Sequence, residues 1–482
     1  MFKKLTKRYD CLSVSMRASL WFLLANIIQK GMNIISTPIF TRLMTTSEYG
    51  MYSLYQSWRD IIMIFATLNV FNYAASKAMT KYVEQQDEFV AAAQGLISCL
   101  TVICFLIYYV VWIFQGDILG LPISVMVGLF FEILFVSAFN LWACKERFDN
   151  HYKLLVIFSI IMGGLGPIAG TFAVISAVHK GLARIYATIL INCWVGSYIY
   201  IYNFKKGGII FNKELWLYSL KFCIPLIPHF LSTQILIKSD RIMIEKMCGL
   251  GKTGIYSLAY SVSMLMSIIS DAINQVLIPW TYRKISQKKY DDIKNPINSI
   301  IVLVAISNLG LILIAPELVN FFATKEYYEA IYIIPPVAMS VYFIFLFNVF
   351  ANIEYYYEET KFVTLASITA AILNILLNYF LISKYGYIAA GYTTLLCYII
   401  YSLSHFIFMK IVCKKHVDGY KFYNNKFIIS FSSFFIIVGI ICITLYKSIL
   451  MRYSILMLGC IFLLKKKKYI ETIIYNSNKK ES

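Results

Sequence analysis

Four cationic side chains lie inside otherwise apolar segments of the sequence: Lys30, Arg59, Lys238 and Arg241. An ionised group at the centre of a bilayer costs on the order of 2.5–3.5 kcal/mol even on mild scales, so such groups face protein or water. Around Lys238, polar residues recur at i, i+4, i+7 and i+11, which places them on one helix face: Gln234, Lys238, Arg241 and Glu245. We expect this face to line a wet cavity.

Carboxylates accompany these cations, and more than one role is open to each. Asp240 is adjacent to Arg241, and it either serves gating or ion coupling or fixes the turn into a loop over residues 249–254. Glu132 is the only carboxylate in its apolar segment. It is either a structural partner of a nearby cation or a protonatable coupling site.

Polar residues also recur at helical spacing in three further segments: Asn26, Lys30 and Asn33 in the first, Gln56 and Asp60 in the second, and Tyr260, Ser263 and Asp271 in the eighth. Such residues either line a cavity or join membrane helices by hydrogen bonds. In the fifth segment, the Gly-Gly-x-Gly-Pro run over 163–167 predicts a bend used for packing.

The composition sets the class of protein. Of 482 residues, 59% are hydrophobic and 14% are charged, whereas soluble domains are about 45–50% apolar and about 25% charged. An all-α integral membrane protein follows. Since a bilayer needs about 20 apolar residues per helix, the sequence predicts about 14 transmembrane helices. Their approximate cores are 18–41, 51–75, 89–114, 121–143, 153–176, 182–204, 217–247, 254–279, 296–322, 331–353, 363–383, 387–409, 427–446 and 449–464.

The net charge of +19 is distributed by membrane side. With both termini in the cytoplasm, about 31 of the 44 Lys and Arg fall on the cytoplasmic side, as the positive-inside rule requires. This distribution argues for orientation and attraction to anionic lipid, and against nucleic acid as a partner. The cations around Lys238 are an exception on the opposite side.

Neither a metal nor a redox cofactor is expected. The 11 Cys lack C-x-x-C spacing and the 5 His are dispersed, so no ligand cluster is indicated. The connections are short and no catalytic cluster appears, so we expect no enzymatic activity.

An internal repeat organises the chain. The stretch 50–57 matches 254–261 at five of eight positions, at an offset of 204 residues, with Gly-x-Tyr-Ser in both copies. Six crossings return a chain to the same side, so the halves are predicted to be parallel repeats related by a pseudo-two-fold along the membrane normal. The predicted parts are a six-helix lobe at 1–204, a second at 205–410, and two helices with a basic tail at 411–482.

Several motifs together resemble one family. They are Pro38, Arg42-Leu43, Glu48-Tyr49-Gly50-x-Tyr52-Ser53, Pro225-x-x-Pro228, Asp240-Arg241 and Gly254-x-Tyr256-Ser257. Over nearly its full length the sequence resembles the bacterial O-antigen and capsular polysaccharide flippases (Wzx type) of the multidrug/oligosaccharidyl-lipid/polysaccharide (MOP) exporter superfamily. The resemblance implies a two-lobed carrier of the bacterial inner membrane that works by alternating access.

The implied cargo is an undecaprenyl-pyrophosphate-linked oligosaccharide repeat unit, and its chemistry assigns the polar residues. A pyrophosphate needs cations in a wet cavity; we assign Lys30, Arg59, Lys238 and Arg241, with the second pair facing the first across one cavity. Sugar contacts are assigned to Asn26, Asn33, Gln56, Tyr260 and Ser263. Coupling to H+ or Na+, or gating, is assigned to Asp60, Glu132, Asp240 and Asp271.

The implied partners, besides the lipid-linked oligosaccharide, are membrane lipids and the polysaccharide polymerase and chain-length regulator proteins. Two other functions compete. A cation-coupled drug antiporter of the same superfamily would share the fold, but expelling cations favours an acidic cavity. A membrane polymerase or acyltransferase would need a large external loop or a catalytic cluster.

Overall fold

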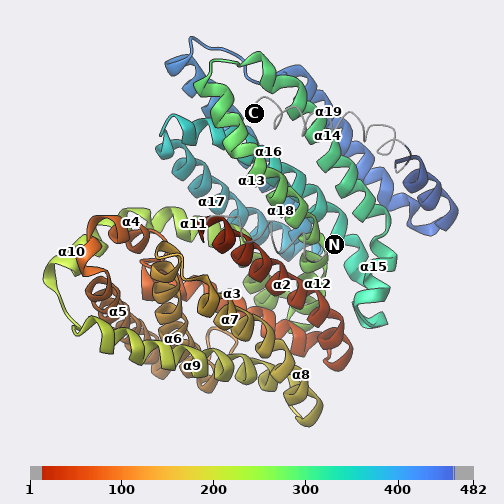
Figure 1. Cartoon of the computed structure of the whole chain (residues 1–482). Helices are drawn as coiled ribbons and strands as arrows, with labels where there is room; N and C mark the ends of the chain where they lie inside the picture. The colour runs from red at the N-terminus through yellow and green to blue at the C-terminus, as the bar shows by residue number, and fades with distance from the viewer. Residues whose placement is uncertain (1–13, 460, 462–482) are drawn as a thin grey trace, which may run out of the picture. The chain divides into compact units, whose positions relative to one another are not determined.

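A computed structural model describes residues 14–459 and 461, and all regular structure in that part of the chain is helical (Figure 1). The chain divides into two compact units. Unit 1 comprises residues 1–234 and 249–254, and unit 2 comprises 235–248 and 255–482. The three-part division at 204 and 410 stays a prediction.

Unit 1 contains α2 (Val14–Leu43), α3 (Thr46–Thr67), α4 (Ala74–Lys81), η1 (Val83–Gln85), α5 (Gln86–Gln115), α6 (Ile123–Phe148), α7 (Tyr152–Ile160), η2 (Ile161–Leu165), α8 (Gly166–Ser176), α9 (Lys180–Gly207), α10 (Lys213–Cys223) and η3 (Ile224–Leu226). Helices α11 (Ile227–Cys248) and α12 (Leu250–Ser263) have residues in both units. Unit 2 continues with α13 (Leu265–Ser286), α14 (Asp291–Leu313), α15 (Ala315–Phe322), η4 (Lys325–Tyr332), α16 (Ile334–Tyr356), α17 (Thr360–Tyr385), α18 (Ala389–His416), α19 (Asn425–Thr444) and η5 (Leu445–Lys447), followed by a short helix, Ile449–Gly459.

The prediction of a polytopic all-α membrane protein is confirmed. Among the described residues, 11 helical spans are long and apolar enough to cross a membrane. The three other predicted segments correspond to α2, α3 and the short helix Ile449–Gly459.

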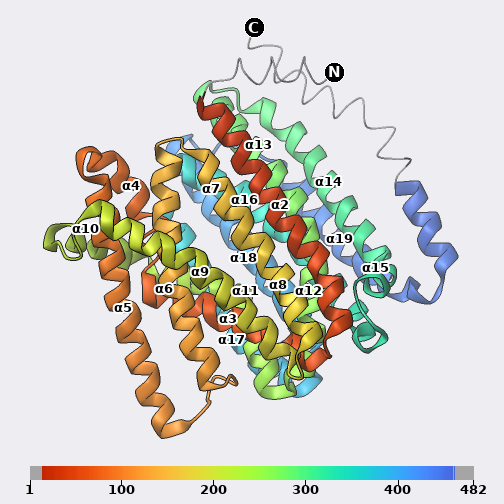
Figure 2. The same cartoon turned by 60° about the horizontal axis from the view of Figure 1, so that its bottom comes forward.

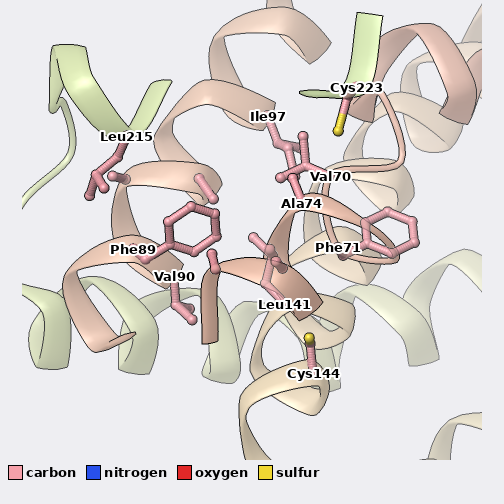
Figure 3. Packing of buried hydrophobic residues seen from close by; sticks show 14 of the residues in the cluster. Val70, Phe71, Ala74, Phe89, Val90, Ile97, Leu141, Cys144, Leu215 and Cys223 are labelled. Atoms are coloured by element: carbon pink, nitrogen blue, oxygen red, sulfur yellow. The ribbon is translucent and has the colours of Figure 1, made fainter. Parts of the chain in front are cut away.

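Unit 1 is built on α5, α6 and α9, which pack side by side in both views (Figures 1 and 2). A buried core of apolar side chains from α4, α5, α6 and α10 lies at one end of this group (Figure 3). Its labelled members are Val70, Phe71, Ala74, Phe89, Val90, Ile97, Leu141, Cys144, Leu215 and Cys223.

The second predicted segment, 51–75, is wrong at its end. Helix α3 stops at Thr67, and the chain turns through Leu68 and Asn69, both with left-handed φ values of 50° and 51°. Thr67 stabilises this turn because its Oγ1 donates to the Met63 carbonyl (2.7 Å) and accepts from the Asn69 N–H (3.2 Å). The side chain of Thr67 therefore helps to end the helix inside the predicted segment.

The seventh segment, predicted as one helix over 217–247, is interrupted. Helix α10 ends at Cys223, and a 3₁₀ turn with Pro225 precedes α11. The predicted loop over 249–254 is also wrong, since Gly249 alone, with φ +86°, separates α11 from α12. Glycine takes that conformation without the steric cost that a Cβ would bring.

The glycine-rich break in the fifth segment forms a π-helical turn, Ile161–Leu165. A Cβ on Gly163 would lie 2.6 Å from Cγ of Gln29 in α2, and Gln29 Nε2 donates to the Ser159 carbonyl (2.7 Å). The bend therefore lets α2 approach closely, and the prediction of a packing role is confirmed.

Unit 2 centres on α16, which is buried along most of its length and packs closely against α18 (Figure 2). The short helix Ile449–Gly459 is held to α15 by Arg452. Its guanidinium donates to both carboxylate oxygens of Glu317 (2.6 and 2.8 Å) and to the Leu313 carbonyl (2.8 Å).

Candidate functional site

The start of α3 fixes the first copy of the Gly-x-Tyr-Ser motif. Thr45 caps the helix in a capping box with Glu48, and the other Glu48 oxygen accepts the backbone N–H of Lys180 (3.1 Å), at the start of α9. This carboxylate therefore satisfies backbone donors at two helix ends. Glu48 therefore joins the start of α3 to the start of α9.

The two motif glycines meet each other. A Cβ on Gly50 would lie 2.0 Å from the Leu250 carbonyl oxygen, and a Cβ on Gly254 would lie 2.0 Å from that of Thr46. The offset of 204 residues relates the members of both contacts, so the contact is reciprocal, as between segments related by a two-fold axis. Only glycine allows the backbones of α3 and α12 to approach this closely.

The first polar cluster lies in unit 1 and surrounds a fully buried carboxylate. We call it the Glu132 cluster: Tyr55, Arg59, Asp60, Glu132 and Asn192. Tyr55 OH donates to Glu132, Asn192 Nδ2 donates at 2.8 Å, and Arg59 Nη1 lies 3.1 Å from it. Arg59 also binds Asp60 (3.0 Å). Glu132 is thus a partner of a cation; its coupling role stays a prediction.

A second cation in unit 1 was not singled out from the sequence. Arg184 of α9 is buried, and its guanidinium carbon lies 3.6 Å from the ring centres of both Phe40 and Tyr52. Aromatic faces stabilise a guanidinium at such distances. Arg184 lies near the beginning of the predicted apolar segment 182–204. A cation inside that segment is the one sequence signal that could have identified it.

The second polar cluster lies in unit 2 and surrounds the other candidate carboxylate of the motif region. We call it the Asp240 cluster: Asp240, Tyr256, Asn374, Asn378 and Thr394. Asp240 is fully buried and accepts from Tyr256 OH (2.5 Å), Thr394 Oγ1 (2.7 Å) and Asn378 Nδ2 (2.6 Å). The alternative that Asp240 fixes a turn is wrong, because its partners lie on α12, α17 and α18.

Arg241 is adjacent to this cluster and makes different contacts. Its guanidinium carbon lies 4.3 Å from the ring centre of Tyr260, and Nη1 donates to the Ile237 carbonyl (2.8 Å). Its side chain is buried with that of Tyr260. Both residues were assigned to substrate, and the structure places them in contact with each other.

The other assigned residues are not members of the two clusters, and the side chains of some of them are not described. Ser263 is buried and donates to the carbonyls of Ala259 (2.8 Å) and Ile334 (3.3 Å), and Gln56 donates to Tyr52 OH (3.0 Å). Lys238 is half-buried on α11, and Asp271 is exposed on α13. The side chains of Asn26, Lys30 and Asn33 lie outside the described residues. Their assigned roles stay predictions.

The donor set around Asp240 defines what this cluster can bind. Hydroxyl and amide groups present either a hydrogen or an oxygen, so these groups can stabilise an ionised carboxylate or turn oxygens toward a small hard cation. Within residues 14–459 and 461, no group of three or more His, Cys, Asp and Glu could hold a metal ion.

Comparison with known proteins places this architecture in a class. The model of the family described as "Polysaccharide biosynthesis protein" matches residues 15–285, and the chain belongs to this family. Its fold is that of transporters of the MOP superfamily. An inward-facing multidrug resistance MATE family transporter of that superfamily has a TM-score of 0.64 and 13% identity, covering 83% of this chain and 100% of the transporter.

Two further similarities are to proteins described as flippases. The lipid II flippase MurJ in an inward closed conformation has a TM-score of 0.64 and 17% identity, covering 90% of this chain and 100% of MurJ. The "probable low-salt glycan biosynthesis flippase Agl15" of Haloferax volcanii is 20% identical over 402 residues, 81% of this chain and 82% of that protein. The chain is thus a multi-pass membrane protein that belongs to the polysaccharide biosynthesis protein family and has the fold of known transporters.

Proposed function

We propose that this protein flips undecaprenyl-pyrophosphate-linked oligosaccharide repeat units across the bacterial cytoplasmic membrane by alternating access, for a surface polysaccharide such as O-antigen or capsule. The family match over residues 15–285 carries this proposal. The similarity to Agl15 and MurJ, which are described as flippases, supports it. Both termini would lie in the cytoplasm, and polymerase and chain-length regulator proteins would act next.

The buried cations fit an anionic head group. Arg59 and Arg241 lie in different units, and neither side chain is more than partly exposed. Of the two, Arg241 is the better pyrophosphate ligand, because its contacts are an aromatic ring and a carbonyl, whereas Arg59 is already bound to two carboxylates. A phosphate oxygen can add charge-assisted hydrogen bonds to a stacked guanidinium without displacing a carboxylate.

Gene loss tests the reaction itself. In a strain lacking the gene, lipid-linked repeat units should accumulate on the cytoplasmic leaflet and the surface polysaccharide should disappear. Accumulation on the outer leaflet would instead indicate the polymerase function. Unchanged polysaccharide with altered drug susceptibility would indicate the drug antiporter.

Arg241→Ala tests the head-group site. At equal protein level, it should reduce surface polysaccharide at least tenfold, since a lost charge-assisted contact is worth about 1.5–3 kcal/mol. The matched control is Lys384→Ala, which removes an exposed cation from α17 in the same unit. Wild-type polysaccharide in the Arg241→Ala strain would contradict the assignment.

We also propose that the Asp240 cluster couples transport to H+ or Na+. The charge-removing variant Asp240→Asn should abolish the acceleration of flipping by an imposed ion gradient, while Asp418→Asn, an exposed loop carboxylate, should keep it. Imposing sodium and proton gradients separately identifies the ion. Gradient-dependent flipping by Asp240→Asn would overturn this assignment.

A further inference from the structure

A cleft in unit 1 has no part in either polar cluster. It has a volume of about 600 Å³ and lies between the end of α6, the start of α7 and the last turns of α9. We call it the α6–α9 cleft; the residues that define it are Trp142, Glu146, Lys153, Phe158, Tyr198 and Lys206. The charge distribution predicts that this end of the helices faces the cytoplasm.

One wall of the cleft is aromatic and continues onto the outer surface of the unit. Trp142 is buried and meets Phe158 edge to face at 5.6 Å, and Phe158 lies 6.2 Å from the ring of Tyr198. Tyr198 is 63% exposed, and Leu154 beside it is 58% exposed. Rings of this kind prefer the interface between head groups and acyl chains, and the adjoining apolar side chains suit an acyl chain.

The charges of the cleft favour an anion. Lys153 and Lys206 both line it with exposed side chains. Lys206 lies 3.6 Å from the Asp87 carboxylate, which Lys145 already approaches at 2.6 Å. The carboxylate inside the cleft, Glu146, is bound by His151 (3.3 Å). Two lysines therefore line a cleft whose lining includes one carboxylate, Glu146.

The turn between α6 and α7 keeps these groups in place. Asn150 has a φ of +57°, and the His151 N–H donates to the Glu146 carbonyl (2.8 Å). The turn thus places Lys153 in the lining of the cleft that Lys206 also lines. A site that is cationic, aromatic-walled and open toward apolar surface matches the head group and upper acyl chain of a lipid.

We propose that the α6–α9 cleft binds the phosphate head group of an anionic phospholipid, with the phosphate between Lys153 and Lys206 and the acyl chains along Leu154 and Tyr198. Zwitterionic lipids place a choline or ethanolamine cation beside the phosphate and should bind less well there. This site does not depend on the proposed transport function, because none of the residues assigned to the cargo lines the cleft.

The test measures lipid binding to the full-length protein in detergent. Native mass spectrometry with added phosphatidylglycerol should show bound lipid on the wild type, with at least fivefold less phosphatidylcholine bound at equal concentration. The variant Lys153→Gln/Lys206→Gln should lose this preference. The control Lys361→Gln/Lys384→Gln, which removes two exposed cations from α17, should keep it.

Further arms separate the phospholipid from other sources of phosphate. Inorganic phosphate at 100-fold excess should not displace phosphatidylglycerol, because it lacks the acyl contacts; Tyr198→Ala should weaken binding for the same reason. Equal binding of both lipids, displacement by inorganic phosphate, or an unchanged preference in the double variant would overturn the proposal. Thermal unfolding of each variant without lipid shows that it is folded.

Discussion

Tyr52 in α3 and Tyr256 in α12 occupy the same position in two copies of one motif, and they make different contacts. The ring of Tyr52 lies under the Arg184 guanidinium (3.6 Å), and its hydroxyl accepts from Gln56. The hydroxyl of Tyr256 donates to the buried carboxylate of Asp240 (2.5 Å). The ring of Tyr256 also lies 5.9 Å from the guanidinium carbon of Arg241. The two copies therefore differ in the hydroxyl, which accepts from an amide in Tyr52 and donates to a carboxylate in Tyr256.

The same contrast separates the two buried carboxylates. Glu132 is neutralised by Arg59, whereas the hydrogen-bond donors of Asp240 are hydroxyl and amide groups. An ion pair fixes its members, because removing either one leaves a buried charge. A carboxylate held by neutral donors can gain or lose a proton or a cation while those donors rearrange. The Glu132 cluster is therefore a structural ion pair, and the Asp240 cluster has the neutral donors that the proposed coupling role would need.

The largest losses of stability should come from substituting the glycine that begins both copies of the motif. Gly50→Ala and Gly254→Ala each place a Cβ about 2.0 Å from a backbone oxygen. Each should destabilise the protein by roughly 3 kcal/mol or more, because the backbones of α3 and α12 must separate. Thermal unfolding in detergent measures this loss. The control Gly31→Ala, which has open space at its Cβ, should be neutral or stabilising. If Gly254→Ala were tolerated and Gly50→Ala were not, the two contacts would not be equivalent.

The next largest effect is a difference in stability between variants of the two arginines, Arg59 and Arg241. Arg59→Met leaves Glu132 buried without its cation and should cost about 2–3 kcal/mol, a value reduced because Arg59 is 25% exposed. Arg241→Met loses a ring contact and one hydrogen bond and should cost about 1 kcal/mol. Denaturant or thermal unfolding compares them directly. Equal losses would mean that the Arg59–Glu132 pair is not the structural element inferred here.

The two tyrosine variants should differ less in stability than the two arginine variants. Here the variant in unit 2 should be the more harmful. Tyr256→Phe removes a donor to Asp240 and should cost about 1–2 kcal/mol. Tyr52→Phe keeps the ring under Arg184 and should cost less than about 1 kcal/mol. If Tyr52→Phe destabilised the protein more than Tyr256→Phe in the same unfolding assay, the hydroxyl would matter more in the first copy of the motif, contrary to the contacts described here.

The smallest effect on stability should come from Glu359, a carboxylate outside both clusters and outside the membrane spans. Lys415 and then His416 bind Glu359, and the hydrogen bond from Lys415 holds the pKa of Glu359 below its usual value. A lowered pKa in the folded state stabilises the protein above the unfolded pKa of about 4.3. This stabilisation is lost as the pH falls through the lowered value.

Melting temperatures of the wild type and Glu359→Gln should therefore differ at pH 7, by less than about 2 °C. The difference should vanish at a pH below the folded pKa of Glu359. A gap that widens on acidification would show that Glu359 acts through something other than its charge.

The sequence was sufficient for the class of fold, because apolar length and charge bias follow from the chain alone. It also identified Glu132, Asp240 and Arg241, since an ionisable residue in an apolar segment is conspicuous. It could not identify their partners, because Asn378 and Thr394 lie 138 and 154 residues from Asp240. Asn192 was missed for the same reason, since only helix packing brings α9 beside Glu132 of α6.

The alternative that Asp240 fixes a turn depended on the predicted loop. A charged residue near a predicted loop suggests a turn, and the loop predicted over 249–254 contains glycines at 249, 251 and 254. Two of these glycines are helical, and Gly254 serves the crossing with α3. Glycine in a membrane helix marks a close approach as readily as a turn.

The most direct test of the proposed function is flipping by the purified protein in sealed liposomes. An undecaprenyl-pyrophosphate-linked oligosaccharide with a labelled sugar is incorporated in both leaflets, and the fraction modified by a membrane-impermeant enzyme is measured. Transporter-containing liposomes should expose nearly all of the lipid, against about half in empty liposomes, and Arg241→Ala should restore the lower value. If the wild-type protein left half of the lipid protected under every imposed gradient, the proposed function would be contradicted.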